Sequence, residues 1–517
     1  MNNHQLISNH DVFREVLYSL ASYDQDKPLK ALRLASHVCT SWRQIILSSP
    51  ALWGRAVNME ELNQKTDNWR TEVVRRTGDA ELCIRARCYP SAQSERFIIS
   101  LIQGNWHRIK YLHICLTNSF LHSPNIRSKI FQTPAPSLEH FVVQGVNLFE
   151  HYDSEDEDEA GNEDEPSLVV GDRGERFRAA SFGGSAPRLT HFASPALLLP
   201  PAASCVSQLL HLDFAAKPRA RDLLNTLRLM PNLQSLRVRI VGNDSGSQDA
   251  TTTPTPAELV FLPHLSHVHI STLAAWKVAI ETLDRLRPFP GFRLEFRVDE
   301  AQEEISSAYA VAIKRVFGRI LQDVKEVNLL NVTIYDDCLS IDTANKFHFG
   351  FGSRGTLLPI LQGMLCLPQS GLLLAKKLLF TKSSEDRLYD EIIMAFTSSL
   401  SEVESLHVDV PTLAYIHNLS LRHLGPPFFP LLKDIELSGR NMPFATILEL
   451  FLDHRKTLNG SAMIQSLTIY GLAGNNLSNL ERFNGLLVEG YFHGKRIHYV
   501  CGSGRPEILN FTEADEW

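Results

Sequence analysis

The sequence predicts an α/β protein in which an N-terminal helical segment precedes a solenoid, with a curved parallel sheet and helices on its convex side. Two observations lead to this class: amphipathic stretches fill residues 8–54, and a strand pattern of the form L-x-x-L-x-L recurs over the rest of the chain. The chain has 517 residues, 44% hydrophobic and 21% charged, which is enough apolar material for a folded core.

Three short helices are expected in residues 8–54. The first starts with Ser8 as N-cap and Asp11 as its capping-box partner, and an apolar stripe follows at helical spacing: Val12, Phe13, Val16, Leu17 and Leu20. The second covers residues 29–39, and the third begins near Thr40. A unit this small removes too little surface from water by itself, so we expect its remaining apolar face to contact a partner.

Two separated motifs in this segment resemble the F-box. Residues 8–20 follow the opening pattern Leu-Pro-x-Glu-Ile-Leu-x-x-Ile-Phe-x-x-Leu, with Ser8-Asn9 in place of the usual Leu-Pro. Val38-Cys39-Thr40-Ser41-Trp42-Arg43 matches Val-Cys-x-x-Trp-Arg, and Pro50-Ala51-Leu52-Trp53 matches the closing Pro-x-Leu-Trp. Residues 75–84 are also similar to the segment that joins F-box and repeats in fungal F-box proteins.

The resemblance implies docking on the Skp-type adaptor of an SCF (Skp–cullin–F-box) ubiquitin ligase, and through that adaptor on a cullin. The chain would then be a non-catalytic substrate receptor without a cofactor. The alternative is a scaffold or inhibitor protein whose three helices only cap the repeats. The residues expected to carry docking are Val12, Phe13, Val16, Leu17, Val38, Cys39, Trp42, Leu52 and Trp53.

The strand pattern recurs nine times, and its first residues are Leu138, Leu189, Leu209, Leu233, Leu265, Val324, Val403, Leu432 and Ile464. The spacing is that of leucine-rich repeats or slightly longer, but irregular and without the usual asparagine, so the array is degenerate. Helical patterns lie between the strands, over residues 220–229, 275–286, 305–321, 388–400 and 445–458. Each strand would bury its leucines against a return segment, and stacking would complete the core.

These patterns divide the chain into four parts. We expect residues 7–54 to form the F-box that the resemblance implies, 55–105 a connecting segment with a first irregular repeat, 106–500 the leucine-rich-repeat-like domain and 501–517 a tail. Disordered insertions are expected near 150–186 and 242–257. The first contains nine carboxylates in residues 153–165, and without them the net charge of −7 becomes −7 + 9 = +2. We expect this run to be a solvated insertion, although it could recruit a basic partner or accept phosphate on Ser154.

A nearly neutral body without a basic stripe is a poor match for nucleic acid, so we expect a protein target instead. The sheet pattern exposes a set of candidate contacts for it: Arg237, Arg239, His267, His269, Glu404 and Asp409. It also puts His140, His191, His211 and His267 at one repeat position, where they would form a column if the registers align. A shared repeat template explains such a column better than an anion, metal or pH-sensing site.

We identify no catalytic constellation. Residues 350–355 match the dinucleotide fingerprint G-x-G-x-x-G, but no acidic residue follows about 20 positions later, so a turn between repeats is the better interpretation. Cys83 and Cys88 lack a second pair of ligands, which favours reduced thiols over a zinc site. No apolar run approaches the roughly 18 residues of a membrane span, and we expect no signal peptide, so the predicted location is the cytoplasm, the nucleus or both.

Overall fold

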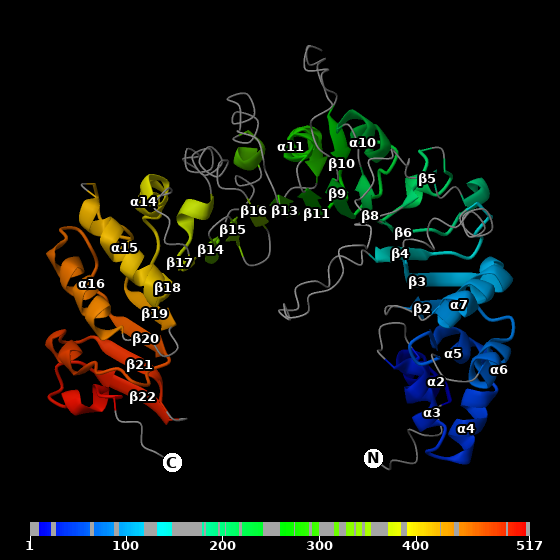
Figure 1. Cartoon of the computed structure of the whole chain (residues 1–517), viewed down its shortest axis with the longest axis horizontal. Helices are drawn as coiled ribbons and strands as arrows, with labels where there is room; N and C mark the ends of the chain where they lie inside the picture. Colours follow the sequence, from blue (N-terminus) through cyan, green and yellow to red (C-terminus); the bar gives the residue numbers. More distant parts are fainter. Residues whose placement is uncertain are drawn as a thin grey trace, which may run out of the picture. The chain divides into compact units, whose positions relative to one another are not determined.

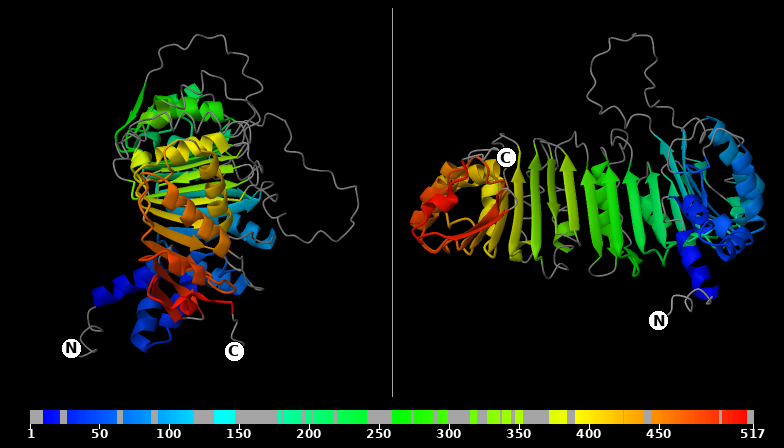
Figure 2. Two further views of the ribbon diagram at one scale, coloured as in Figure 1. Left: turned by 90° about the vertical axis from the view of Figure 1, so that its left-hand side faces the viewer. Right: turned by 90° about the horizontal axis from the view of Figure 1, so that it is seen from below.

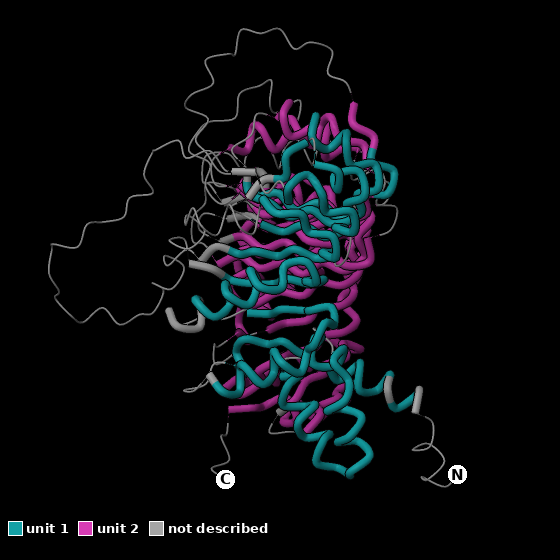
Figure 3. Tube along the Cα trace, turned by 90° about the vertical axis from the view of Figure 1, so that its right-hand side faces the viewer, with its two compact units in different colours: residues 1–216, 225–239, 262–264 teal, residues 217–224, 240–261, 265–517 magenta. Residues whose placement is uncertain are grey.

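The computed structural model divides the chain into two units (Figure 3). Unit 1 comprises Met1–Ala216, Asn225–Arg239 and Leu262–His264, and unit 2 comprises Lys217–Leu224, Ile240–Phe261 and Leu265–Trp517. The structure describes residues 10–21, 27–62, 67–86, 92–117, 132–146, 178–179, 182–194, 197–201, 203–216, 220–240, 259–272, 275–288, 292–298, 315–319, 327–335, 338–343, 347–352, 371–383, 390–423, 425–438, 444–492 and 495–512.

Unit 1 begins with helices and continues as a sheet (Figure 1). Its helices are α2 (His10–Leu20), α3 (Pro28–Ala35), α4 (Thr40–Leu47), α5 (Pro50–Arg55), α6 (Asp67–Thr77) and α7 (Ala92–Asn105), with the 3-10 turns η1 (Trp106–Arg108), η4 (Phe182–Gly184) and η5 (Val206–Gln208). Its sheet consists of β1 (Val57–Asn58), β2 (Leu82–Ala86), β3 (Ile109–Thr117), β4 (His140–Val146), β6 (His191–Ser194), β8 (His211–Ala216) and β9 (Ser235–Ile240). From β1 to β8 each strand pairs with the next in parallel, and β5 (Arg178–Ala179) and β7 (Leu197–Leu198) form a small separate sheet.

The sheet strands of unit 2 carry helices on one face. Its strands run in the order β11 (His267–Thr272), β13 (Arg293–Val298), β16 (Phe347–Gly352), β15 (Cys338–Asp342), β14 (Leu329–Tyr335), β17 (Lys377–Lys382), β18 (Ser405–Asp409), β19 (Asp434–Ser438), β20 (Ser466–Tyr470), β21 (Leu487–Phe492) and β22 (Lys495–Val500). All these pairs are parallel except those of β15 with its two neighbours and the β21–β22 hairpin, and the arrows of β13 to β17 lie side by side in Figure 2.

The helices of unit 2 are α11 (Trp276–Arg285), α14 (Asp390–Ser399), α15 (Val410–Arg422) and α16 (Ala445–Thr457). Helices α14, α15 and α16 lie next to one another on one side of β17 to β20 (Figure 1). Hydrogen bonds tie α15 to both neighbours, from Tyr415 to Asp390 at 2.7 Å and between Ser420 and His454 at 3.1 Å. Short elements complete the described chain: β10 (Val260–Leu262), β12 (Leu286–Pro288), η7 (Gly371–Leu374), η8 (Ser478–Arg482) and η9 (Pro506–Leu509). Helix α10 (Ala220–Leu227) has residues in both units.

The recurring apolar pattern builds the cores. In unit 2 Leu406, Ile435 and Leu467 are register partners on β18, β19 and β20, and all three are fully buried. In unit 1 Phe141 is the register partner of Phe192, and their stacked rings lie 5.4 Å apart. Alternate positions face away from these cores, as expected for strands. The predicted α/β class with a mostly parallel sheet is therefore confirmed within each unit.

One strand begins later than the sequence pattern predicted. We placed the pattern at Val324, but β14 starts at Leu329, and the buried residues are Val327, Leu330 and Val332. The correct motif therefore starts at Val327, because the other strands start two residues after the first apolar position of the motif. Strands β3, β13 and β17 and helices α6, α7 and α15 were not predicted.

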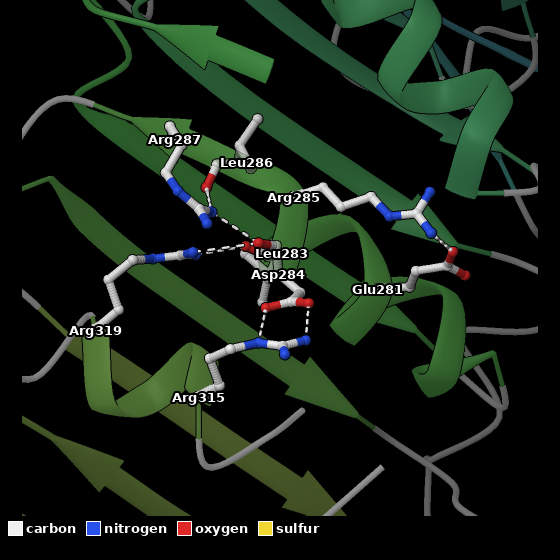
Figure 4. Close-up of polar contacts among 8 residues, drawn as sticks. All are labelled: Glu281, Leu283, Asp284, Arg285, Leu286, Arg287, Arg315 and Arg319. Carbon is white, nitrogen blue, oxygen red and sulfur yellow. Dashed lines mark hydrogen bonds and ion pairs between the residues drawn. The ribbon is translucent and has the colours of Figure 1, made fainter. Parts of the chain in front are cut away.

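Guanidinium groups cap the C-terminal end of α11 (Figure 4). Arg319 donates to the carbonyl oxygens of Leu283 at 2.6 Å and Asp284 at 3.2 Å, and Arg287 donates to the latter oxygen at 2.7 Å. Arg315 pairs with the Asp284 carboxylate. Because the last carbonyls of a helix have no partner within it, these contacts fix the helical residues 315–319 against α11. The rest of the helix predicted over 305–321 lies outside the described residues.

Two further domain predictions and one turn prediction need correction. Leu509 and Phe511 are buried, and Phe511 exchanges hydrogen bonds of 2.8 Å with Gly474 and Asn475, so residues 501–512 belong to unit 2 and are not a tail. Phe182 is fully buried with its ring 5.2 Å from that of Phe141, so the end of the predicted insertion 150–186 belongs to the core. The acidic run 153–165 and the insertion 242–257 lie outside the described residues. Gly350 and Gly352 lie in strand β16 and not in a turn, while 353–355 are not described.

Candidate interaction surfaces

Five of the nine predicted docking residues are accessible. Val12 and Val16 on α2 are 47% and 49% exposed, and Val38, in the turn between α3 and α4, is 62% exposed. Cys39 is exposed as well, and Trp42 on α4 is half-buried. We call these five residues the apolar helical surface. Exposed side chains that the prediction missed, Leu34 and Leu47, lie on α3 and α4.

The other four predicted docking residues are buried and hold the helices together. Leu17 and Leu52 are fully buried, and the ring of Phe13 packs 4.3 Å from that of Trp42. Trp53 is 3% exposed and donates a hydrogen bond from Nε1 to the Ile46 carbonyl at 2.8 Å. The prediction that these four side chains contact a partner is therefore wrong for the described chain, because a side chain buried in the core has no exposed surface for a partner to contact. The sequence pattern could not distinguish the exposed docking residues from the buried ones, since most residues of both sets are apolar and recur at helical spacing.

The helices are joined firmly to the start of the sheet. The Glu61 carboxylate accepts hydrogen bonds from the backbone N–H groups of Leu29 at 2.8 Å and Lys30 at 2.7 Å, which caps the N-terminus of α3. A Cβ atom added to Gly54 in α5 would lie 2.4 Å from the carbonyl oxygen of Glu81, so α5 packs directly on the backbone before β2. A fourth helix, α5, thus follows the three predicted ones and joins them to the start of the sheet in unit 1.

A histidine column lies on the sheet of unit 1. His140, His191 and His211 are register partners on β4, β6 and β8, and their rings stack with centroids 3.9 Å and 4.0 Å apart. Tyr111 on β3 extends the column, with its ring 5.4 Å from that of His140. The fourth predicted member, His267, belongs to β11 of unit 2, where its register partner is Arg293. The predicted column is therefore present with three histidines and not four.

The column favours neutral imidazoles. Burial, together with the charges of His140 and His211, lowers the pKa of His191 to about 3. Burial also lowers the pKa of His140. Rings stacked in parallel do not direct their lone pairs to one point, and the described part of the chain contains no group of three or more histidine, cysteine or acidic side chains that could hold a metal ion.

The predicted target contacts differ in availability. Arg237 and Arg239 are exposed on β9 of unit 1, and a guanidinium nitrogen of Arg237 lies 3.9 Å from a carboxylate oxygen of Asp213. In unit 2 His267 is exposed, while His269 Nδ1 lies 2.9 Å from a carboxylate oxygen of Glu295. Because Asp213 and Glu295 lie beside these basic side chains, the surface carries both positive and negative groups and not a uniformly positive charge.

Of the two predicted acidic contacts, only one remains a candidate. Glu404 lies 3.4 Å from Lys433 and 3.9 Å from Lys376. Asp409 is the N-cap of α15 and accepts a hydrogen bond from the Thr412 N–H at 2.9 Å. Because this carboxylate is needed to end the strand and start the helix, we remove Asp409 from the candidate contacts.

The strands β17, β18 and β19 carry a charged cluster that was not predicted from the sequence. The Glu436 carboxylate is 2.6 Å from Lys377 Nζ and 3.2 Å from His407 Nδ1. Burial alone raises the pKa of Glu436, but its hydrogen bonds and attraction to Lys377 and His407 outweigh this effect, so the pKa falls below its ordinary value. Strand β17, which carries Lys377, was not predicted from the sequence because its motif starts with Ala375 instead of a larger apolar residue. The parallel register of β17, β18 and β19 brings Lys377, His407 and Glu436 close together.

Free thiols among the described side chains are Cys39, Cys83, Cys115, Cys205 and Cys501. Burial raises the pKa of Cys83 to about 11, so this thiol stays protonated near neutral pH. Its predicted neighbour in a zinc site, Cys88, lies outside the described residues.

Neither a protein-family model nor a curated protein sequence matches the chain. No helix in the part of the chain that the structure describes has the length and apolar character needed to cross a membrane. The function is therefore inferred from the residues themselves.

Proposed function

We propose that the protein is the substrate-recognition subunit of an SCF-type cullin-RING E3 ubiquitin ligase. In this proposal residues 7–54 form an F-box that docks on the Skp-type adaptor, and the sheet strands with their helices form a degenerate leucine-rich-repeat domain that binds a target protein. The chain contributes no catalytic group and acts by bringing the target to the ligase, in the cytoplasm, the nucleus or both.

The observation that carries the proposal is the apolar helical surface. Val12, Val16 and Val38 stay about half exposed or more although the core beneath them is complete, with Leu17 and Leu52 fully buried. Exposed apolar side chains grouped on neighbouring helices are typical of a protein-binding site. They fall at motif positions at which the sequence resembles the F-box, so their exposure and the resemblance support the same function.

The expected strength of docking follows from the exposed area. Burying the exposed half of a valine contributes about 1 kcal/mol, because full burial of such a side chain is worth about 1.5–3 kcal/mol. An aspartate in the same place loses this contribution and adds the cost of a buried carboxylate without a partner, which is several kcal/mol. Replacing Val12 and Val16 together by aspartate should therefore weaken adaptor binding by about 100-fold or more.

The test is calorimetric titration of the purified full-length protein with a purified Skp-type adaptor. The unchanged protein should bind, V12D/V16D should bind at least about 100-fold more weakly, and L450D should bind like the unchanged protein. Leu450 on α16 is a matched control because it is 51% exposed and belongs to unit 2. Leu17 is unsuitable for this test, since it is fully buried and its replacement would unfold the helices.

The result also separates the two functions that the sequence left open. If V12D/V16D and the unchanged protein bind the adaptor equally well, the apolar helical surface is not the docking site. If the unchanged protein does not bind the adaptor at all, while affinity purification still recovers a target through the sheets, the scaffold or inhibitor function replaces the ligase function.

A further inference from the structure

Unit 2 contains a cavity of about 110 Å³ between the C-terminal half of α16 and the segments that precede β20 and β21. Its apolar wall includes Leu452, Phe483 and Leu486, which are all buried. Met463 is 65% exposed and also lines the cavity, so it marks the side that faces solvent. A cavity of this size accepts a short aliphatic group, since an engineered cavity of about 150 Å³ binds benzene.

The polar part of the wall is positively charged. Arg455 and Lys456 both line the cavity, and none of its lining residues is acidic. The ammonium group of Lys456 lies 4.0 Å from the ring centroid of Phe483. Neither cation forms an ion pair with a carboxylate of the residues that the structure describes, so the wall carries two positive charges without a counter-charge.

The buried cation is Arg455, which is only 7% exposed. It donates from its two terminal nitrogens to the carbonyl oxygens of Phe428 at 3.0 Å and Phe429 at 2.5 Å. Its Nε atom is buried without a hydrogen-bond partner, as is Oγ of Ser461 in the same wall. Burial lowers the pKa of Arg455 to about 10, which is the electrostatic effect expected for a cation without an anion beside it.

A buried charge is costly unless an opposite charge compensates it. The Phe428 and Phe429 carbonyls compensate Arg455 in part, and they explain why the side chain is held in place. They do not neutralise it, and they do not use the donors left on Arg455 Nε and Ser461. An anionic group with an apolar tail would supply the missing charge to Arg455 and Lys456 and place its tail against Leu452, Phe483 and Leu486.

We propose that this cavity is a binding site for a small monocarboxylate with a short aliphatic tail. The carboxylate would be held by Arg455, Lys456 and Ser461, and the tail would fill the apolar part. The site belongs to unit 2 and is independent of adaptor docking, so the two proposals stand or fall separately.

The test uses pentanoate, 1-pentanol and pentylamine as probes of one tail length with a negative, neutral and positive head. Binding to the full-length protein is followed by titration calorimetry. Pentanoate should bind saturably, pentanol about 10-fold more weakly as the loss of one charge-assisted contact predicts, and pentylamine not measurably. Lys456→Gln and Ser461→Ala should each weaken pentanoate binding several-fold, and Met463→Trp should block it by filling the cavity from the solvent side.

Arg482→Gln is the matched control, because Arg482 lies 5.1 Å from the same Phe483 ring but does not line the cavity. This variant should bind pentanoate like the unchanged protein. Arg455 is left unchanged, since its removal would free two backbone carbonyls and destabilise the fold. The proposal is overturned if pentanoate does not bind, if pentanol binds as tightly as pentanoate, or if Met463→Trp has no effect.

Discussion

Acidification should destabilise unit 1 through the histidine column, and His191 is the residue that reports it. The ring of His191 stacks between those of His140 and His211, at 3.9 Å and 4.0 Å. Its pKa is about 3 in the folded chain, while an unfolded histidine titrates near pH 6.5. Below pH 6.5 the unfolded chain therefore binds a proton that the folded chain does not bind, and the free energy of unfolding decreases until the pH passes through about 3.

The size of the effect follows from this linkage. One proton bound only by the unfolded chain costs about 1.4 kcal/mol per pH unit. His191 is half-buried, and solvent partly screens its charge, so we expect a smaller loss of about 1 kcal/mol in total between pH 6.5 and 4.5. Above about pH 7 His191 should not contribute to the pH dependence, since both states then carry neutral imidazole.

The assay is urea unfolding of the unchanged protein and of His191→Phe at pH 7.5, 6.5, 5.5 and 4.5. Phenylalanine keeps a flat ring in the stack but does not titrate, so the difference between the two proteins isolates His191 from all other groups. The stability of the variant relative to the unchanged protein should rise by about 1 kcal/mol from pH 6.5 to 4.5 and stay constant above pH 7. A difference that does not change with pH would refute the reasoning.

Two further substitutions test how the helices are attached. Gly54→Ala should lower the free energy of unfolding by about 1–3 kcal/mol, because the new Cβ would meet the Glu81 carbonyl oxygen. Gly104→Ala on α7, where the added Cβ has open space, should instead raise the free energy of unfolding by about 0.5–1 kcal/mol. Equal effects of the two substitutions in urea unfolding would argue against close packing of α5. Glu61→Gln should cost about 1 kcal/mol, because a charged cap on the first two amides of α3 becomes neutral, and unchanged thermal unfolding would show that the cap does not hold α3.

The sequence predicted the strands well where large apolar residues repeat. The pattern at Leu432 predicted β19 because its apolar positions are buried, and two of them, Ile435 and Leu437, lie between register partners on β18 and β20. The pattern failed where a small residue opens the motif, as at Ala375 before β17, and where two overlapping motifs compete, as at Val324 and Val327 before β14. Spacing alone does not choose between registers, since only packing shows which set of side chains is buried.

The candidate sites were predictable to different degrees. Helical spacing identified both Val16 and Leu17, but only the packed structure shows that Val16 is exposed and Leu17 is not. The histidine column followed from the repeat, because parallel strands in register place equivalent residues side by side. The cavity beside Arg455 could not be predicted, since its lining comes from segments whose approach is set by tertiary contacts.

The measurement that tests the central proposal most directly is hydrogen exchange of the full-length protein with and without a Skp-type adaptor. The account predicts slower exchange in peptides covering α2, the turn at Val38 and α4, with no change in α15 or α16. Protection confined to the sheets, or no protection in residues 10–47, would contradict docking through the apolar helical surface.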